Sequence, residues 1–337
     1  MPFLLALFVV AGGLAILQVA INPYISVLGP KGGESRRLSL AQAFNSLGTT
    51  IAPIVAATYL LSDTIMSSSS IAELDEAAKL AYYAQEASAV QGPFLWLAGA
   101  FVALAILVSV IKLPTVLAQK AGALSHYFEA LGNRRLRFGA LGIFVYVGAE
   151  VALGSYMVSY GLSLEIAEAL RENAVVGALV QFAASIKGTE VAGMDAKAVI
   201  GALLTFYWGG AMLGRFLGSA LMTRIAPNKL LGLFALLAMM MVLISINASG
   251  IFALMALLAV GFFNSIMFPT IFTLAIDELG ELKPLGSGIL CTAIFGGAVI
   301  PPAVGWLADV TGGFGAAFLL PLLCYLYIQF YAFRVAR

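Results

Sequence analysis

One carboxylic acid, Glu150, lies deep inside an apolar stretch of this sequence. It stands about twelve residues into the run 138–160, and a helical rise of about 1.5 Å per residue places it roughly 18 Å along a membrane span, near the midplane. A carboxylate at that depth is costly unless it is paired, hydrated or protonated. The position therefore favours a group that releases and regains a proton or binds a cation. The alternative is a carboxyl group that is hydrogen-bonded to a neighbouring helix for structural reasons.

Amide side chains form a second group that could bind a ligand. Gln42 and Asn45 are three residues apart and share one face of a helix. Amides donate and accept hydrogen bonds at the same time, as the hydroxyl groups of a sugar require. The alternative role for both residues is to hold neighbouring helices together.

The spacing of prolines indicates an internal repeat. Pro23 precedes Pro53 by 30 residues, and Pro269 precedes Pro301 by 32. The residue five places before the first proline of each pair is an amide. Proline inside a helix leaves a carbonyl without its usual donor and kinks the helix, so neighbouring groups must accommodate it. The first three spans thus correspond in the same orientation to the last three, a pattern found in transporters whose site lies between repeats.

The two repeat-related amides are Gln18 and Asn264, and we expect them to face one cavity from opposite halves. Nearby aromatic side chains could stack on the face of a sugar ring, although aromatic residues in spans more often pack or face lipid. The aromatic residues considered for stacking are Tyr146, Tyr156, Tyr207 and Trp208. Of these, Tyr156 and Trp208 complete the candidate binding set.

A glycine repeat surrounds the one arginine found within a span. Gly210, Gly214 and Gly218 recur every four residues, which predicts a close helix contact rather than a phosphate-binding loop. Arg215 lies toward the end of the same span, where it can extend to the interface or pair with loop carbonyls. We expect its role to be structural.

The composition assigns the chain to the membrane proteins. Hydrophobic residues make up 61% and charged residues 10%, and the mean hydropathy is +1.00, which is too apolar for a water-soluble domain. The net charge of +1 gives no indication of a nucleic-acid partner. The spans hold no pair of aspartates, no Ser/His pair and no metal-ligand cluster, and the single His126 excludes a two-histidine motif. The sequence therefore predicts neither an enzyme nor a bound cofactor.

Nine apolar stretches are long enough to cross a membrane core of roughly 30 Å. The first begins almost at Met1, and the absence of a preceding basic region favours a span over a signal peptide. The loop 62–92 is Ser-rich and acidic, and the apolar run Val175–Ser185 is too short to cross, which predicts an interfacial helix. The expected spans are 3–23, 39–61, 93–112, 138–160, 199–222, 229–246, 251–276, 285–307 and 314–333.

Loop charge predicts the orientation of these spans. One alternating set of loops, together with Lys229 and the C-terminal tail, holds thirteen of the 18 Lys and Arg residues. The opposite loops hold four of them and eleven of the 17 acids. Because basic loops remain cytoplasmic, we expect the N-terminus outside and the C-terminus inside.

The longest basic loop, 112–137, divides the chain unequally. It separates a partial N-terminal half, 1–111, with three spans from a C-terminal half, 138–337, with six. If the halves are equivalent, three spans are missing at the N-terminus, so the chain is expected to be truncated and inactive in sugar uptake when expressed alone. A transport-incompetent fragment or a membrane sensor derived from a transporter is therefore the alternative to an active transporter.

Several long strings resemble one known family, the fucose–galactose–glucose symporters of the major facilitator superfamily. The resemblance covers essentially the whole chain and is strongest to the bacterial glucose/galactose transporter branch. The strings are NPY at 22–24 with VLGP at 27–30, LAQAFNSLGTTIAP at 40–53, YVGAEVA at 146–152, YWGGAMLGRF at 207–216 and FNSIMFPTIF at 263–272.

This resemblance implies an all-α membrane fold of two six-helix halves, of which this chain begins at the fourth helix. It also implies proton- or sodium-coupled uptake of a monosaccharide by a monomer in the bacterial inner membrane. Fucose–proton symporters carry a glutamate where this chain has Gln18, so one coupling acid is absent. Their first helix, which supplies another acid, is not in this chain. Glu150 is then the remaining candidate for coupling.

Overall fold

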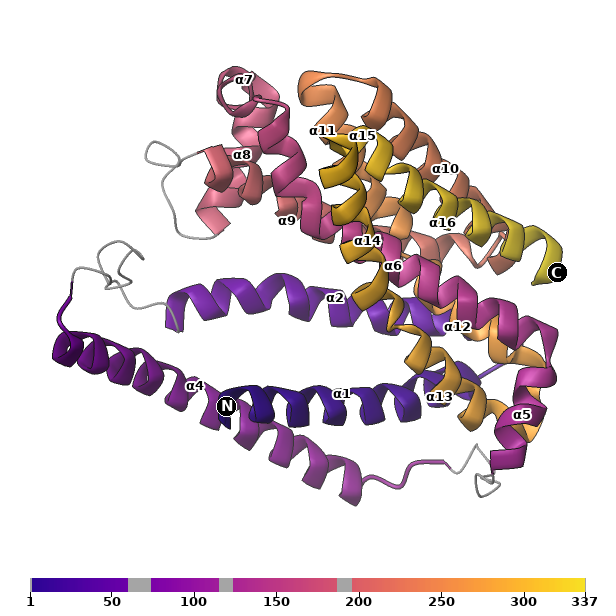
Figure 1. Ribbon diagram of the computed structural model, residues 1–337. Helices are drawn as coiled ribbons and strands as arrows, with labels where there is room; N and C mark the ends of the chain where they lie inside the picture. Colours follow the sequence, from indigo (N-terminus) through magenta and orange to yellow (C-terminus); the bar gives the residue numbers. More distant parts are fainter. Residues whose placement is uncertain (1, 60–73, 115–123, 187–195, 337) are drawn as a thin grey trace.

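The computed structural model describes residues 2–59, 74–114, 124–186 and 196–336, and these residues form helices and turns without any strand (Figure 1). The expected all-α membrane fold is confirmed. The helices are α1 (Pro2–Val27), α2 (Glu34–Tyr59), α4 (Glu76–Val110), α5 (Leu124–Gly132), α6 (Arg134–Ser163), α7 (Ala167–Glu172), α8 (Ala174–Ile186), α9 (Ala196–Leu221), α10 (Pro227–Asn247), α11 (Gly250–Asn264), α12 (Met267–Ile276), α13 (Lys283–Ala293), α14 (Gly296–Thr311), α15 (Phe314–Ala317) and α16 (Leu319–Phe330).

Each of the nine expected spans coincides with helical structure in its described residues, residues 60–61 of the second span lying outside them, but the last three are broken. The span 251–276 is divided into α11 and α12, 285–307 into α13 and α14, and 314–333 into α15 and α16. In the described part of the chain, seven helical stretches are long and apolar enough to cross a membrane, and one of them, Gly250–Thr311, holds two expected spans. The more polar α2, which carries amide and hydroxyl side chains, is not among the seven.

Two of the expected loops contain helices. The second part of the loop 62–92 is helical because α4 begins at Glu76, where the Asp75 carboxylate accepts a hydrogen bond of 2.7 Å from the Ala78 N–H. The basic loop 112–137 likewise contains α5 and the first turn of α6. The run Val175–Ser185 forms α8, as predicted, after the Asn173 side chain caps its first N–H groups. Its position at the membrane interface stays a prediction.

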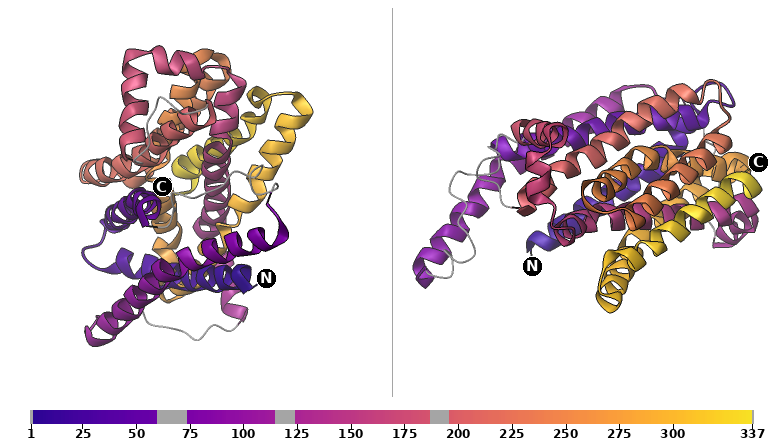
Figure 2. Two further views of the ribbon diagram at one scale, coloured as in Figure 1. Left: turned by 90° about the vertical axis from the view of Figure 1, so that its left-hand side faces the viewer. Right: turned by 90° about the horizontal axis from the view of Figure 1, so that it is seen from above.

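The helices pack around α6, which is buried along most of its length and contacts α12, α14 and α16. Among the N-terminal helices, α1 packs against α13, and α2 packs against α9 and α12. The left view of Figure 2 shows α1 and α4 at the lower side of the molecule, as in Figure 1. In Figure 1, the α1–α2 turn, α5 and the C-terminus lie at one end, whereas α7 and α8 lie toward the other.

The predicted glycine contact is present between α9 and α11. A Cβ atom at Gly214 would collide with the Phe262 carbonyl oxygen and the Ser265 side chain, and one at Gly210 would lie 3.3 Å from the Phe262 backbone nitrogen. The absence of side chains here therefore lets the two backbones approach closely. This approach brings the next residue of α9, Arg215, to the C-terminal end of α11.

Candidate functional site

The carboxyl group of Glu150 is held by a tyrosine of its own helix. Tyr146, one turn earlier on α6, donates a hydrogen bond of 2.7 Å from its hydroxyl to Glu150 Oε1. Tyr207 on α9 donates to the backbone carbonyl of Glu150 at 3.1 Å. Tyr146 and Tyr207 are buried, whereas Glu150 is partly exposed. The hydrogen bond from Tyr146 thus orients the acid, and the residue as a whole keeps some exposed surface.

Asn264 extends this group of polar side chains from α11. Its Nδ2 donates to the Tyr207 hydroxyl at 3.0 Å, and the whole residue is buried. Neither Asn264 Oδ1 nor the buried Tyr325 hydroxyl has a hydrogen-bond partner among the described residues. Buried polar atoms are rarely left unpaired, so these two atoms mark a place for water or a polar ligand.

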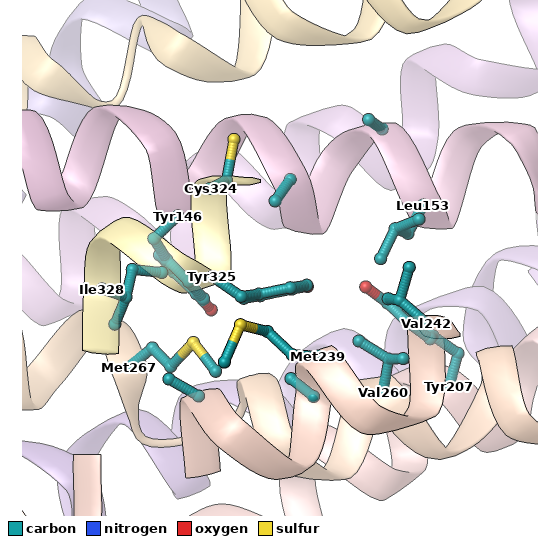
Figure 3. Close-up of a cluster of buried hydrophobic side chains, with 14 of the residues drawn as sticks. Tyr146, Leu153, Tyr207, Met239, Val242, Val260, Met267, Cys324, Tyr325 and Ile328 are labelled. Atoms are coloured by element: carbon teal, nitrogen blue, oxygen red, sulfur yellow. The ribbon is translucent and has the colours of Figure 1, made fainter. Parts of the chain in front are cut away.

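Figure 3 shows the apolar surroundings of these tyrosines. Tyr146, Tyr207 and Tyr325 come from three different helices and are enclosed by aliphatic and sulfur-containing side chains. The labelled neighbours are Leu153, Met239, Val242, Val260, Met267, Cys324 and Ile328. Hydroxyl groups in such surroundings depend on a few specific partners, which makes their orientation well defined. We call Tyr146, Glu150, Tyr207, Asn264 and Tyr325 the carboxyl cluster.

A second group of polar side chains joins α1 to α2. Gln42 Nε2 donates to Asn22 Oδ1 at 3.4 Å, and Asn45 Nδ2 donates to Gln42 Oε1 at 3.2 Å. Asn22 is buried, and its Nδ2 has no partner in the described structure. Gln42 is partly buried and Asn45 is exposed. We call Asn22, Gln42 and Asn45 the amide cluster.

The structure thus brings Gln42 and Asn45 together, as their spacing predicts, and adds Asn22. Asn22 was not expected as a site residue, although its position directly before Pro23 in an apolar span was a usable signal. Gln18 lies one turn before Asn22 on α1 and is exposed. The side chain of Gln18 is therefore on the same side of α1 as the amide cluster without being part of its hydrogen bonds.

Arg215 connects the two clusters. Its Nε donates to the Ser265 carbonyl at 3.0 Å, where α11 ends. Its Nη1 donates to Ser46 Oγ and, at 3.4 Å, to the Gln42 carbonyl on α2. The guanidinium also lies within electrostatic range of Glu150. Of the two carbonyls that Arg215 binds, that of Ser265 lies in the turn between α11 and α12 and that of Gln42 lies within α2.

The aromatic candidates separate into two positions. Trp208 is 42% exposed and packs edge to face against Tyr207, with ring centroids 5.1 Å apart, so it lies beside the carboxyl cluster. Tyr156 lies elsewhere: its ring packs against Phe314 at 5.8 Å and its hydroxyl lies against Gly305. Six residues separate Tyr156 from Glu150, which places the two side chains on different faces of α6.

No family model matches the chain. Individual proteins do. A glucose/galactose transporter of Brucella abortus is 44% identical over 331 residues, which cover 98% of this chain and 70% of that protein. A putative glucose/galactose transporter of Helicobacter pylori is 41% identical over 336 residues, and the L-fucose-proton symporter of Escherichia coli is 33% identical over 337 residues. These two matches cover 98% of this chain and, respectively, 73% and 71% of the relatives.

The solved structures agree with the sequence relatives. A crystal structure of the E. coli fucose:proton symporter covers 98% of this chain with a TM-score of 0.83 at 31% identity, and 76% of that structure is matched. A second, described as a major facilitator superfamily transporter in the outward conformation, also has a TM-score of 0.83, at 32% identity, and covers 98% of this chain and 75% of its own. The chain belongs to the major facilitator superfamily. Its named relatives are sugar transporters and not enzymes. This major facilitator protein is accordingly a multi-pass membrane protein of the sugar-transporter class.

The carboxyl cluster and the amide cluster come from different parts of this major facilitator fold. The first is built by α6, α9, α11 and α16, and the second by α1 and α2. Among the described residues no group of three or more His, Cys, Asp or Glu side chains could hold a metal ion. What the arrangement can do is bind a neutral, hydroxyl-rich ligand through amides and exchange one cation or proton at Glu150.

Proposed function

We propose that this protein is a secondary active transporter that takes up a neutral monosaccharide, a hexose of the glucose/galactose type or fucose, together with an ion. The observation that carries the proposal is the 44% identity to a glucose/galactose transporter over 98% of the chain. The relation to fucose–proton symporters supports the same substrate class, because both kinds of relative are named for monosaccharides.

The sugar would be held mainly by amides. Gln42 and Asn45 each present donors and acceptors near one another, and Gln18 and Asn22 lie on the adjoining face of α1. Asn264 would contribute from the opposite half through its unpaired Oδ1. Neutral amides are suited to hydroxyl groups, whereas an anionic substrate would call for more Lys or Arg at this depth.

An aromatic surface completes the proposed binding site. Trp208 is the residue for stacking on the sugar ring, because it is half-exposed beside Tyr207. Tyr156 is not assigned to the sugar, since its ring is packed against Phe314. The binding groups are thus concentrated on the N-terminal helices, with Trp208 and Asn264 on the other side.

Glu150 is the proposed coupling residue, and the coupling ion is H⁺ or Na⁺. A carboxyl group that accepts one hydrogen bond from Tyr146 keeps lone pairs free for a proton or a cation. Arg215 lies within electrostatic range of Glu150 and brings a positive charge close to the proposed coupling site. Coupling follows if the ion and the sugar must both bind before the halves can move.

We further propose that the protein is a monomer of the bacterial inner membrane, with its N-terminus outside and its C-terminus in the cytoplasm. The thirteen basic residues of one set of loops, against four in the other, support this orientation. Bacterial relatives support the inner membrane as the location.

Counterflow in proteoliposomes tests the proposed function. Vesicles preloaded with unlabelled glucose, galactose or fucose should transiently accumulate the labelled form of the transported sugar. Imposing a proton gradient or a sodium gradient separately identifies the ion by which gradient drives net uptake. Binding of a sugar without any counterflow would contradict transport and favour a sensor.

A further inference from the structure

Gly154 lies on α6 one turn after Glu150 and therefore on the same face of the helix. The position is buried, and two aromatic rings of α9 lie directly against its backbone. A Cβ atom added there would lie 3.2 Å from Trp208 Cζ2 and 3.5 Å from Tyr207 Cε1. The missing side chain thus lets both rings rest on α6 beside Glu150.

The two distances predict different effects of an added methyl group on the two rings. A separation of 3.5 Å between carbon atoms is ordinary van der Waals contact, so Tyr207 would keep its place. Tyr207 is also held by its hydrogen bonds with the Glu150 carbonyl and the Asn264 amide. A separation of 3.2 Å is too close, so the Trp208 ring would have to move by a few tenths of an ångström. A side chain at this position would therefore displace the indole and leave the carboxyl cluster in place.

The surroundings of Trp208 determine the direction in which its ring can move. Tyr207, against which Trp208 packs edge to face, is fully buried, whereas Trp208 itself is half-exposed. Because buried regions are close-packed, a ring pushed away from α6 moves toward its exposed side. In the proposed function, that exposed side is the surface on which the sugar stacks.

We propose that Gly154 is a positioning residue that sets sugar specificity, because it lets the Trp208 indole rest on the α6 backbone and so leaves room for a six-carbon pyranose. A side chain at position 154 would push the indole into the binding site. The site would then favour a smaller sugar, such as the same ring without its C6 substituent. The inference rests on the proposed function, since it takes Trp208 as the stacking surface for a monosaccharide.

The contact between Gly154 and the indole can be measured without any sugar. The chain has three tryptophans, and the other two, Trp96 and Trp306, are exposed. With both replaced by phenylalanine, tryptophan fluorescence reports the surroundings of Trp208 alone. Gly154→Ala should change the emission maximum in this background, and the protein should still fold because the ring moves so little. Gly201→Ala on α9 is the matched control, since a Cβ there meets nothing within 4 Å, and its emission should equal that of the parent.

Pairs of sugars that differ only at C6 test the effect on specificity. D-Glucose with D-xylose, D-galactose with L-arabinose, and L-fucose with D-arabinose each share one pyranose ring, and only the first member carries C6. Isothermal titration calorimetry gives the ratio of the two dissociation constants for the pair that the parent protein binds. In Gly154→Ala this ratio should change by about tenfold in favour of the smaller sugar, the effect of one methyl group in a pocket. Gly201→Ala should keep the parent ratio.

A shorter ring at position 208 is the decisive arm of the experiment. Phenylalanine reaches less far than tryptophan, so Trp208→Phe vacates the space that a Cβ at position 154 would take. In the Trp208→Phe protein, Gly154→Ala should therefore leave the sugar ratio unchanged.

Three results would overturn the proposal: an unchanged emission maximum in Gly154→Ala, an unchanged sugar ratio in Gly154→Ala, or a full change of the ratio that persists in the Trp208→Phe protein. Failure of the proposed function has a different signature. In that case the parent protein would bind no sugar of the three pairs, while Gly154→Ala would still change the emission of Trp208. The specificity role would then fall with the proposed function, and only the contact between position 154 and the indole would stand.

Discussion

At the scale of single residues, Glu150 is the position where a small change should separate uphill accumulation of sugar from sugar exchange. Glu150→Gln keeps the shape of the side chain and the acceptor for the Tyr146 hydroxyl, but it cannot release a proton or bind a cation as strongly. Uphill accumulation should therefore be lost, and the sugar should only equilibrate across the membrane. Exchange of internal for external sugar should be retained to a greater extent.

Accumulation and counterflow, measured on the same proteoliposomes, check this prediction. Retained counterflow serves as the control for folding of the Glu150→Gln protein. Accumulation at the level of the parent protein would mean that ion coupling takes place at another residue.

The amide cluster should determine affinity for the sugar. Gln42→Ala and Asn45→Ala should each weaken binding by about 1–3 kcal/mol, because a hydroxyl or amide partner is left unsatisfied. Isothermal titration calorimetry with the transported sugar measures the loss. Asn247→Ala is a suitable control, since its amide donates only to Leu243 O of its own helix, at 2.8 Å, and this change should leave affinity unaltered. Equal affinities of the parent and of both variants would exclude the two amides as ligands.

The sequence allowed part of the site to be predicted and not the rest. Gln42 and Asn45 share a helix face by spacing alone, and Glu150 is conspicuous because an acid in an apolar span is rare. The bonds of Tyr207 to Glu150 and to Asn264 depend on how α6, α9 and α11 pack, which no local pattern specifies. The face on which Tyr156 lies, in contrast, could have been derived from its separation from Glu150.

At the scale of elements, the close approach of α9 and α11 should be sensitive to any added side chain. Gly214→Val should destabilise the protein by about 1–3 kcal/mol, because its Cβ meets the Phe262 backbone and the two helices must separate. Gly209 is the matched control on the same helix, since an added Cβ there meets nothing within 4 Å. Thermal unfolding in detergent should show a lower midpoint for Gly214→Val than for Gly209→Val. Equal midpoints would contradict the close contact.

Hydropathy was sufficient to locate the long helical stretches, and it failed where helices break or extend beyond the apolar run. The break between α11 and α12 lies inside continuous apolar sequence, and it forms where Pro269 removes a hydrogen bond and Arg215 supplies a substitute. The replacement of a lost backbone hydrogen bond by a side chain of another helix depends on tertiary contacts, which give no hydropathy signal. The polar start of α4 was missed although the Asp75 cap preceding Glu76 could be recognised in the sequence.

At the scale of the whole molecule, the remaining prediction is its orientation in the membrane. The turn between α1 and α2, α5 and the C-terminus lie at one end of the molecule (Figure 1), and the loops of that end carry most of the basic residues. The opposite end carries α7 and α8, whose flanking sequence is acidic. Basic segments resist translocation, so the first end should be cytoplasmic.

Single cysteines in a background without Cys291 and Cys324 test this orientation in intact cells. Glu168→Cys, on exposed α7, should react with a membrane-impermeant maleimide from outside, whereas Lys31→Cys, in the exposed α1–α2 turn, should react only after the membrane is permeabilised. The permeabilised sample controls for reactivity, because both thiols are then accessible. Labelling of Lys31→Cys in intact cells with protection of Glu168→Cys would reverse the assignment, and with it the direction in which the proposed coupling at Glu150 would have to operate.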